Sequence, residues 1–229
     1  PFFNPRNNFS IRAGNPDLLP EFTDSYELNS IFALEDISFN LGVYHRFTTE
    51  VIERVSFFED NVNIVMPINL GTNHATGIEF NAKYSPAKWV TFNGDANWLY
   101  FNRLGTFEST VFDFNASQWE SKLTGKFKLP WKIDFETTGR YESAVQTVQG
   151  RRSAILFADM GLRRKILKGR GVINFSVRDI FASRIRETFT NQPGFELYSR
   201  SLRGRFITAG FSYGFGKGEA MEFSGRKRF

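Results

Sequence analysis

The sequence predicts an all-β protein whose antiparallel strands form a transmembrane β-barrel. Three observations favour this fold class: apolar and polar residues alternate with a period of two, short and long connections alternate, and aromatic residues lie near both ends of predicted strands. The sequence has no apolar run near the roughly 20 residues that a membrane-spanning helix needs. Such a chain can cross a membrane only as a closed barrel, because lipid leaves unpaired strand edges without hydrogen-bond partners.

The alternation is clearest between residues 118 and 142. From Trp119 to Trp131 every second residue is apolar, aromatic or small, and most residues between them are charged or carry an amide. Successive side chains of a strand point to opposite faces, so one face is predicted to meet lipid and the other the barrel interior. The candidate interior-facing residues are Lys122, Lys126, Asp134, Glu136 and Arg140.

Nine strands are predicted. Their ranges are 22–34, 37–57, 67–85, 88–104, 114–130, 132–148, 153–167, 171–187 and 195–215. A soluble β-sandwich would alternate too, but a strand from Ile37 to about Val55 is far longer than the 5–6 residues of typical globular strands. A complete bacterial barrel has an even number of strands with both ends in the periplasm. The odd number predicts that the chain is the C-terminal portion of a larger barrel, with 22 strands if it resembles the large outer-membrane transporters.

The connections also match a barrel. Short ones at 35–36, 85–88, 129–131 and 168–171 alternate with longer polar ones at about 58–70, 104–116, 145–153 and 187–197. Outer-membrane barrels have tight periplasmic turns and long extracellular loops. Residues 1–21 are therefore predicted to be an extracellular loop segment, residues 22–215 barrel strands and residues 216–229 a basic periplasmic tail.

Aromatic residues are placed as a barrel requires. Trp119 and Trp131 share a predicted face twelve residues apart, which spans roughly 30 Å at ~3.4 Å per residue and a tilt of ~40°. An apolar band flanked by aromatic girdles is typical of such barrels. The predicted girdle residues are Trp98, Tyr100, Trp119, Trp131 and Tyr141.

Composition sets further limits. The 229 residues include 27 Phe and no Cys, which excludes disulfides and Cys-based metal sites. Residues 1–150 carry 12 Lys and Arg against 18 Asp and Glu, whereas residues 151–229 carry 17 against 6. The basic residues are spread over predicted strands and turns, in runs of at most three such as the tail Arg226-Lys227-Arg228, so no nucleic-acid partner is expected.

No catalytic, cofactor or metal site is predicted. His45 and His74 lack further nitrogen or sulfur ligands nearby in the sequence and are expected at an interface or in a loop. Nucleophile-elbow and P-loop motifs are absent. The remaining candidates, Glu120, Asp134, Glu136 and Glu142, are interpreted as parts of charge ladders across neighbouring strands, and not as an acid–base pair.

Four segments of the chain carry distinctive strand motifs. One is Gly14-Asn15-Pro16-Asp17-Leu18-Leu19-Pro20-Glu21, which resembles the entry to a late strand of TonB-dependent receptors. Another is Asn69-Leu70-Gly71 with Gly77-Ile78-Glu79-Phe80, which resembles a following strand of that family. Arg178-Asp179-Ile180-Phe181-Ala182-Ser183-Arg184 is similar to a segment near the barrel's end, with Ala182 where the family usually has Asn. The closing residues 210–217 resemble the Bacteroidota-type outer-membrane barrels related to SusC-like receptors. Gly71, Gly77 and Gly139 are expected at bends or bulges.

The resemblance implies a bacterial outer-membrane location and import of a nutrient, such as a siderophore, glycan or peptide, energised through TonB. It implies outer-membrane lipid, the rest of the barrel with its plug, TonB and a surface lipoprotein of the SusD kind as partners. It also implies that Tyr213 and Phe215 form the C-terminal insertion signal. The alternative is a barrel of the same family that serves as a structural or assembly partner without transport. An outer-membrane hydrolase ranks last, because neither histidine has a neighbouring serine constellation.

Overall fold

The computed structural model describes residues 3–7, 10–107, 110–192 and 194–215, and nearly all of them lie in β-strands. The strands of the first half are β1 (Phe3–Asn7), β2 (Ser10–Ala13), β3 (Phe22–Ala33), β4 (Ile37–Thr49), β5 (Ile52–Glu59), β6 (Val62–Asn69), β7 (Thr72–Ala87) and β8 (Val90–Phe107). Those of the second half are β9 (Thr110–Leu129), β10 (Ile133–Glu142), β11 (Val145–Thr147), β12 (Gly150–Arg152), β13 (Ile155–Ile166), β14 (Gly171–Arg178), β15 (Ile185–Gln192), β16 (Phe195–Leu202) and β17 (Phe206–Tyr213). The described residues contain no helix long and apolar enough to cross a membrane.

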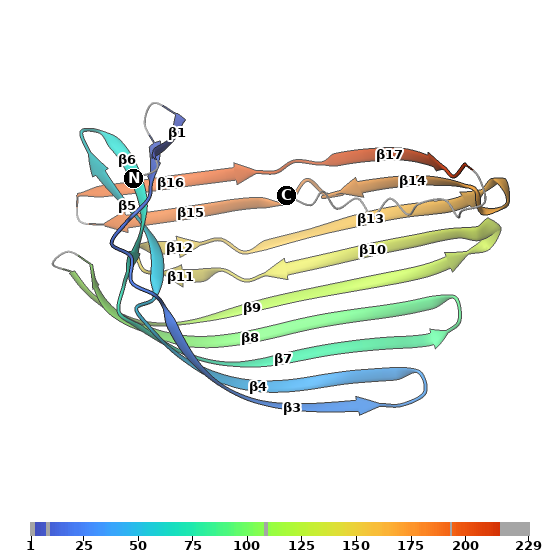
Figure 1. Ribbon diagram of the computed structural model, residues 1–229, viewed down its shortest axis with the longest axis horizontal. Helices are drawn as coiled ribbons and strands as arrows, with labels where there is room; N and C mark the ends of the chain where they lie inside the picture. The colour runs from blue at the N-terminus through green and yellow to red at the C-terminus, as the bar shows by residue number, and fades with distance from the viewer. Residues whose placement is uncertain (1–2, 8–9, 108–109, 193, 216–229) are drawn as a thin grey trace.

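Nine strands form one antiparallel sheet, which we call the wall. Their order is β17-β14-β13-β10-β9-β8-β7-β4-β3, so neighbours in the chain are neighbours in space (Figure 1). The central strands are long, with 16 residues in β7, 18 in β8 and 20 in β9. The nine-stranded arrangement confirms the predicted fold class, although β4 ends at Thr49 and not at residue 57.

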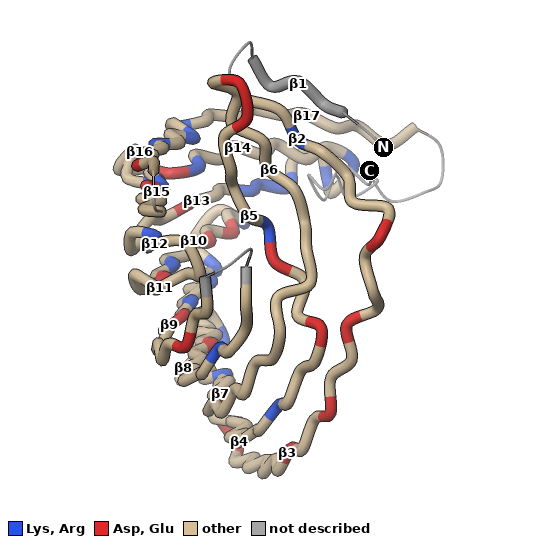
Figure 2. Tube along the Cα trace, turned by 90° about the vertical axis from the view of Figure 1, so that its left-hand side faces the viewer, with Lys and Arg blue, Asp and Glu red and all other residues tan. Residues whose placement is uncertain are grey.

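The wall is curved and open (Figure 2). β3 and β17 are its edges; an odd number of antiparallel strands makes them run in the same direction, as their arrows in Figure 1 show. All twelve residues of β3 are exposed, as expected for a strand paired on one side only. The described strands therefore form part of a barrel wall and do not close it by themselves.

The two faces of the wall differ in polarity. Glu136 pairs in register with Lys126 and with Gly161, whereas its neighbour Phe135 pairs with Phe127 and Leu162. On the polar face the Tyr44 hydroxyl reaches across β7 to the Asn97 side chain, 3.1 Å away on β8. Side chains two strands apart can meet in this way on the concave side of a curved sheet, so the polar face is concave and the apolar face convex.

The short connections lie together at one end of the wall, on the right in Figure 1, which we call the turn end. They comprise residues 34–36, residues 88–89, the 3-10 turn η1 (Pro130–Lys132) and the 3-10 turn η2 (Leu167–Gly169). Trp131 lies in η1 with a φ of 60°, beyond the end of β9 at Leu129. The prediction that Trp131 shares a strand face with Trp119 is therefore wrong, because the turn interrupts the alternation.

The predicted long loops are mostly strands. Residues 58–70 belong largely to the hairpin of β5 and β6, and residues 145–153 and 187–197 contain the hairpins β11–β12 and β15–β16. We call this the hairpin end of the wall. Beyond a membrane both faces of a strand meet water, so hydropathy stops alternating while backbone pairing continues. The polar stretches mark the edge of the apolar band and not the end of the strands.

Two smaller sheets complete the fold at the hairpin end. The sheet β11-β12-β15-β16 continues four wall strands in the same order, β10-β13-β14-β17. The sheet β1-β2-β6-β5 instead crosses the hairpin end on the concave side (Figures 1 and 2). Residues 1–21, predicted to be a loop segment, thus contain β1 and β2. The predicted basic tail, residues 216–229, lies outside the described residues.

Candidate functional site

The concave face carries the five residues predicted to face the interior. Lys122 and Lys126 project from β9 and meet Arg140 and Glu136 of β10 in register, and Asp134 pairs with Lys128. Lys126 Nζ lies 3.6 Å from Glu136 Oε2. Lys122 faces the like-charged Arg140 on one side, and its Nζ lies 3.4 Å from Asp95 Oδ2 on the other. Because these side chains are about half exposed, such pairs contribute little to stability and mainly make the face hydrophilic.

The carboxylates nearer the hairpin end have partners of their own. Glu120 and Glu142 are direct cross-strand neighbours. Arg186 Nη2 donates to Glu142 Oε2 at 2.6 Å, and the Gln118 amide donates to Glu120 Oε1 at 2.7 Å. These contacts make the acidic residues part of a charge ladder, as the sequence suggests, and supply no pair of free carboxyl groups for acid–base chemistry.

On the concave face the Tyr44 ring of β4 packs directly over Gly77 of β7. A Cβ atom added to Gly77 would lie 2.3 Å from Cζ and Oη of Tyr44, so only glycine leaves room for the tyrosine ring. The β4–β7 register continues past Gly77 without a shift, as the β9–β10–β13 register does past Gly139. Neither glycine therefore forms a bulge, and Gly77 makes room for the Tyr44 ring.

The hairpin of β5 and β6, which we call the mouth hairpin (Ile52–Asn69), crosses the hairpin end of the concave face. Its tip is a tight turn at Asp60 and Asn61, both with positive φ. Its strands run up from β4 and β7 toward β16, away from the direction of the wall strands (Figure 1). Val55 in its middle is 1% exposed, so the hairpin is packed against the rest of the protein and does not project into solvent.

The base of the mouth hairpin is clamped by the first two segments that resemble the receptor family. Leu19 N donates to Asn69 Oδ1 at 2.9 Å, and Asn69 Nδ2 donates back to the Leu19 carbonyl at 3.0 Å and to the Glu50 carbonyl at 2.8 Å. Asn15 Nδ2 donates to the Pro67 carbonyl at 3.2 Å. Residues fifty positions apart are thus joined, which accounts physically for the Asn-rich motifs.

At Gly71 the base of the mouth hairpin is in close contact with β8 of the wall. Gly71 has a φ of 70°, and a Cβ there would lie 2.3 Å from the Leu104 carbonyl oxygen of β8. Beside it, Arg103 of β8 forms an ion pair with Glu53 of the hairpin. Burial lowers the pKa of Arg103, but a guanidinium remains charged at any physiological pH.

The third family-like segment forms a kink between β14 and β15. Asp179 is 2% exposed, and its carboxylate accepts hydrogen bonds from the backbone N–H of Ser183 at 2.9 Å and of Arg184 at 3.1 Å. Asp179 N in turn donates to Asp159 Oδ1 at 2.8 Å. Ala182 has a φ of 53°, a conformation that Asn adopts more readily than Ala, which explains why the resembling family usually has Asn there.

The convex face is apolar and aromatic. The Trp98 and Trp119 ring centroids are 6.0 Å apart, while Phe127 lies 5.8 Å from both Phe92 and Phe135 nearer the turn end. From Trp119 to Leu129 β9 rises about 26 Å along a barrel axis, at ~3.4 Å per residue and a tilt of ~40°. This height equals the apolar band of about 25 Å found on outer-membrane barrels.

A comparison with family models decides the family. The model of the outer membrane protein beta-barrel family matches residues 1–213 of the chain. The chain belongs to this family. No curated protein and no solved structure matches it. The outer-membrane barrel protein is therefore located in the bacterial outer membrane, and its long strands are those of a transmembrane antiparallel β-barrel. Proteins of this family are typically not enzymes.

The predicted girdle residues have different positions in this barrel wall. Trp98, Tyr100, Trp119 and Tyr141 lie on the convex face toward the hairpin end, as their registers require. At the turn end the tryptophans are Trp131 and Trp89, both exposed in turns. Trp89 was not predicted. Tyr213 ends β17 beside the exposed Phe215, with ring centroids 4.8 Å apart.

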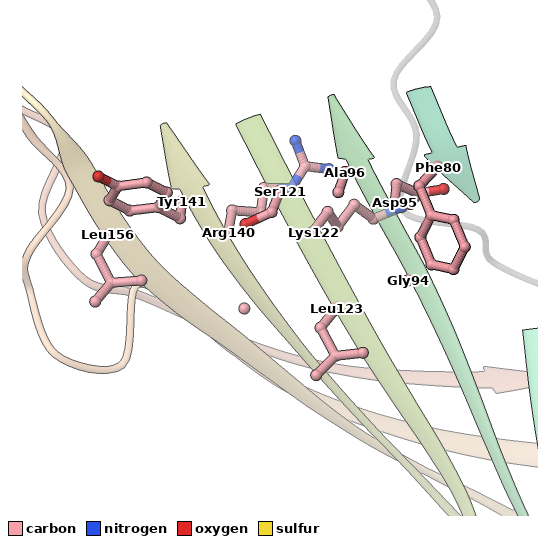
Figure 3. A pocket seen from close by; sticks show the side chains of 11 residues that line it. Phe80, Gly94, Asp95, Ala96, Ser121, Lys122, Leu123, Arg140, Tyr141 and Leu156 are labelled. Carbon is pink, nitrogen blue, oxygen red and sulfur yellow. Dashed lines mark hydrogen bonds and ion pairs between the residues drawn. The ribbon is translucent and has the colours of Figure 1, made fainter. Parts of the chain in front are cut away.

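A shallow hollow of about 340 Å³ lies on the convex face (Figure 3). Small residues form its floor, and larger apolar ones surround it: Gly94, Ala96, Ser121 and Gly139, then Phe80, Leu123, Tyr141 and Leu156. In Figure 3 Lys122 and Arg140 point to the opposite side from Leu123 and Leu156. The hollow thus offers mainly apolar surface to its surroundings.

A wider open hollow of about 960 Å³ borders the sheet β11-β12-β15-β16. Arg151 Cζ lies 5.0 Å from the centroid of the Phe189 ring, which packs at 4.9 Å against Tyr198. Tyr198 Oη donates to Glu187 Oε1 at 2.6 Å, and this hydrogen bond raises the pKa of Tyr198. The cluster fixes the outer part of this sheet in place.

The two histidines lie on adjacent strands of the convex face. The His45 and His74 ring centroids are 6.2 Å apart, and His45 Nδ1 shares a hydrogen bond with Thr76 Oγ1 at 2.9 Å. His74 also packs against Phe47 at 4.5 Å. Within the described residues no group of three His, Cys, Asp or Glu side chains could hold a metal ion.

Sequence reasoning missed the mouth hairpin, its clamp and the hydrogen bonds of the Gln149 side chain with the backbone of Ser56 in β5. A turn signal was present at Glu59-Asp60-Asn61 between two runs rich in branched and aromatic residues. The partners of Asn69 and Gln149 are side chain to backbone contacts over 50 and 93 positions, for which one sequence contains no local signal.

Proposed function

We propose that this outer-membrane barrel protein is a receptor that imports a hydrophilic nutrient, with energy supplied through TonB. One observation carries the import step: the concave face combines charges, amides and hydroxyls over the full height at which the convex face is apolar. A polar interior and an apolar exterior suit a wall that separates a water-filled passage from lipid. In this proposal Lys122, Lys126, Asp134, Glu136 and Arg140 line the passage.

TonB coupling and a surface lipoprotein of the SusD kind rest on the resemblance of residues 14–21, 69–80 and 178–184 to receptor segments. The structure gives these segments mechanical roles, in the clamp and the kink, near the hairpin end. In the proposal this end faces the outside of the cell, because the long connections of outer-membrane barrels are extracellular.

The passage is tested with two neighbouring threonines. Thr138 lies on the concave face, where its hydroxyl is 3.0 Å from that of Thr124, and Thr137 lies on the convex face. The 229 residues contain no cysteine, so Thr138→Cys and Thr137→Cys each introduce a single thiol into this part of the barrel, and the unsubstituted protein serves as the background control. On intact cells a small charged thiol reagent should label Thr138→Cys and leave Thr137→Cys unmodified. Equal labelling of the two would contradict the passage.

Orientation and energy coupling need separate measurements. Gly150→Cys and Gln192→Cys at the hairpin end should react with an impermeant reagent on intact cells, while Gly169→Cys at the turn end should not.

Cells that carry the protein should deplete a compound from a mixed nutrient medium that cells without it leave, and an uncoupler should stop this depletion. Unchanged depletion with the uncoupler would exclude TonB coupling; no protein-dependent depletion would favour a structural partner barrel.

A further inference from the structure

The mouth hairpin is held very differently at its two ends. At the base, chain connectivity, the Asn69 clamp and the buried Leu70 fix it to the wall, with backbone hydrogen bonds of 2.8 Å from Leu70 N to the Val51 carbonyl and 3.1 Å from Val51 N to the Gly71 carbonyl. Farther out, β6 pairs with β2 from Ser10↔Asn63 to Arg12↔Val65, so β2 belongs to the same small sheet and moves with the hairpin. Within the described residues, the contacts that join this outer part to the opposite sheet are neutral: Ser56 bonds to Gln149, and Phe58 packs against Phe195.

Gln149 pairs with the hairpin as another strand would. Ser56 N donates to Gln149 Oε1 at 2.7 Å, and Gln149 Nε2 donates to the Ser56 carbonyl at 2.8 Å. β5 is an edge of its sheet, so these backbone groups have no strand partner. The side-chain amide satisfies both groups of one residue, and Gln149 itself is 8% exposed. Phe58 adds a ring contact with Phe195, 4.9 Å between centroids.

We propose that the mouth hairpin is a lid over the concave face, and that Gln149 holds it closed. The lid opens when Ser56 and Phe58 leave Gln149 and Phe195, while the clamped base stays on β8 and acts as the hinge. A few neutral contacts between segments distant in sequence break far more easily than a base held by the chain itself, so the outer part moves first. The lid thereby decides when a large hydrophilic ligand can enter, a role that rests on the proposed passage.

The first measurement follows lid closure without any transport. Phe58→Cys and Phe195→Cys are introduced together, and a short bismaleimide reagent joins them in the outer membrane of intact cells. Adding Gln149→Ala should lower the rate of cross-linking about tenfold, because two hydrogen bonds are lost. Gln149→Glu keeps an acceptor for Ser56 N–H but loses the donor, and should give a smaller decrease. Gln146→Ala, at an exposed glutamine of the same short hairpin, is the matched control and should leave the rate unchanged.

The second measurement asks whether the lid guards the passage. In a Thr138→Cys background, a bulky polyethylene-glycol maleimide added outside should react about tenfold faster when Gln149→Ala is present, while a small reagent reacts equally in both. Heat-modifiable migration on gels identifies the folded variants that are compared. Unchanged cross-linking in both folded Gln149 variants would overturn the lid. Reduced cross-linking without faster labelling by the bulky reagent would overturn the role of the lid as a guard, whereas failure of the small reagent to label Thr138→Cys would overturn the passage itself.

Discussion

The two halves of the wall extend from the turn end to the hairpin end in different ways. β8 and β9 pair without a register shift from Val90↔Phe127 to Phe107↔Thr110, straight from the turn end to the hairpin end. In the other half β14 stops at Arg178, and the chain kinks at residues 179–184 before β15 begins. Both halves alternate in sequence. Hydropathy therefore predicts where a strand crosses the membrane, whereas capping side chains and positive φ values decide whether it continues straight.

The kinked half replaces ladder bonds with side-chain bonds at three of its breaks. Ser143 Oγ accepts from Trp119 N at 2.9 Å between β10 and β11, and Ser153 Oγ accepts from Glu187 N at 3.0 Å between β12 and β13. Asp179 does the same at the third break. Backbone groups stay paired while the sheet changes direction, which lets β15 and β16 meet the mouth hairpin.

The prediction with the largest expected effect tests whether β10, a strand of the kinked half, alternates regularly between lipid-facing and interior-facing residues inside the membrane. Phe135→Arg on the convex face of β10 should lower the free energy of unfolding by about 2–4 kcal/mol, because a guanidinium is placed near the middle of the lipid. Glu136→Arg, one residue along on the concave face, should cost much less, although Lys126 loses its partner. Urea titration of both variants in lipid vesicles measures the difference, and equal losses would contradict the assignment of the faces.

A second substitution should weaken the kink itself. Asp179→Ala leaves the buried N–H groups of Ser183 and Arg184 without their charged acceptor, which should cost about 3 kcal/mol. Asp113→Ala in the straight half is the control, since exposed Asp113 accepts one side-chain bond from Asn102. Unfolding in urea compares the two. A loss at Asp113 as large as that at Asp179 would remove the special role of the kink.

The straight half has a different vulnerable point. Gly77→Ala should cost about 1–3 kcal/mol, because the new methyl group forces Tyr44 away from Asn97. Gly139→Ala in the kinked half has nothing within 4 Å of the added Cβ and should be tolerated. The same unfolding experiment distinguishes them, and a stable Gly77→Ala variant would show that Tyr44 can move freely.

The prediction with the smallest expected effect is a gain in stability. Ala182→Asn should stabilise the protein by about 0.5–1 kcal/mol, because Asn accepts the left-handed conformation at φ 53° more readily than Ala. Ser183→Asn, at the neighbouring position without positive φ, serves as control and should give no gain. A destabilised Ala182→Asn variant would mean that contacts, and not backbone conformation, determine this residue.

These comparisons also show what one sequence could predict. The faces of β9 and β10 followed from alternation, since lipid and water impose opposite demands on Phe135 and Glu136. The position of Trp131 did not follow from alternation, because this residue lies in a turn with positive φ and not in the expected strand. The mouth hairpin was not predicted: residues 37–57 were interpreted as one strand and residues 58–70 as a loop, whereas β4 ends at Thr49 and β5 begins at Ile52. One sequence does not reveal this break, because Asn69 and Gln149 hold the hairpin through contacts over 50 and 93 positions.

The shared direction of β3 and β17 has a consequence for how such barrels change size. An antiparallel sheet with parallel edges closes only through an odd number of additional strands, so the total is even. Inserting one strand ahead of β3 would reverse every later strand and carry the mouth hairpin to the opposite side of the membrane. Inserting two strands would leave the mouth hairpin on its original side. Barrels of this kind can therefore gain or lose strands in pairs, as whole hairpins, without moving the mouth hairpin to the other side of the membrane.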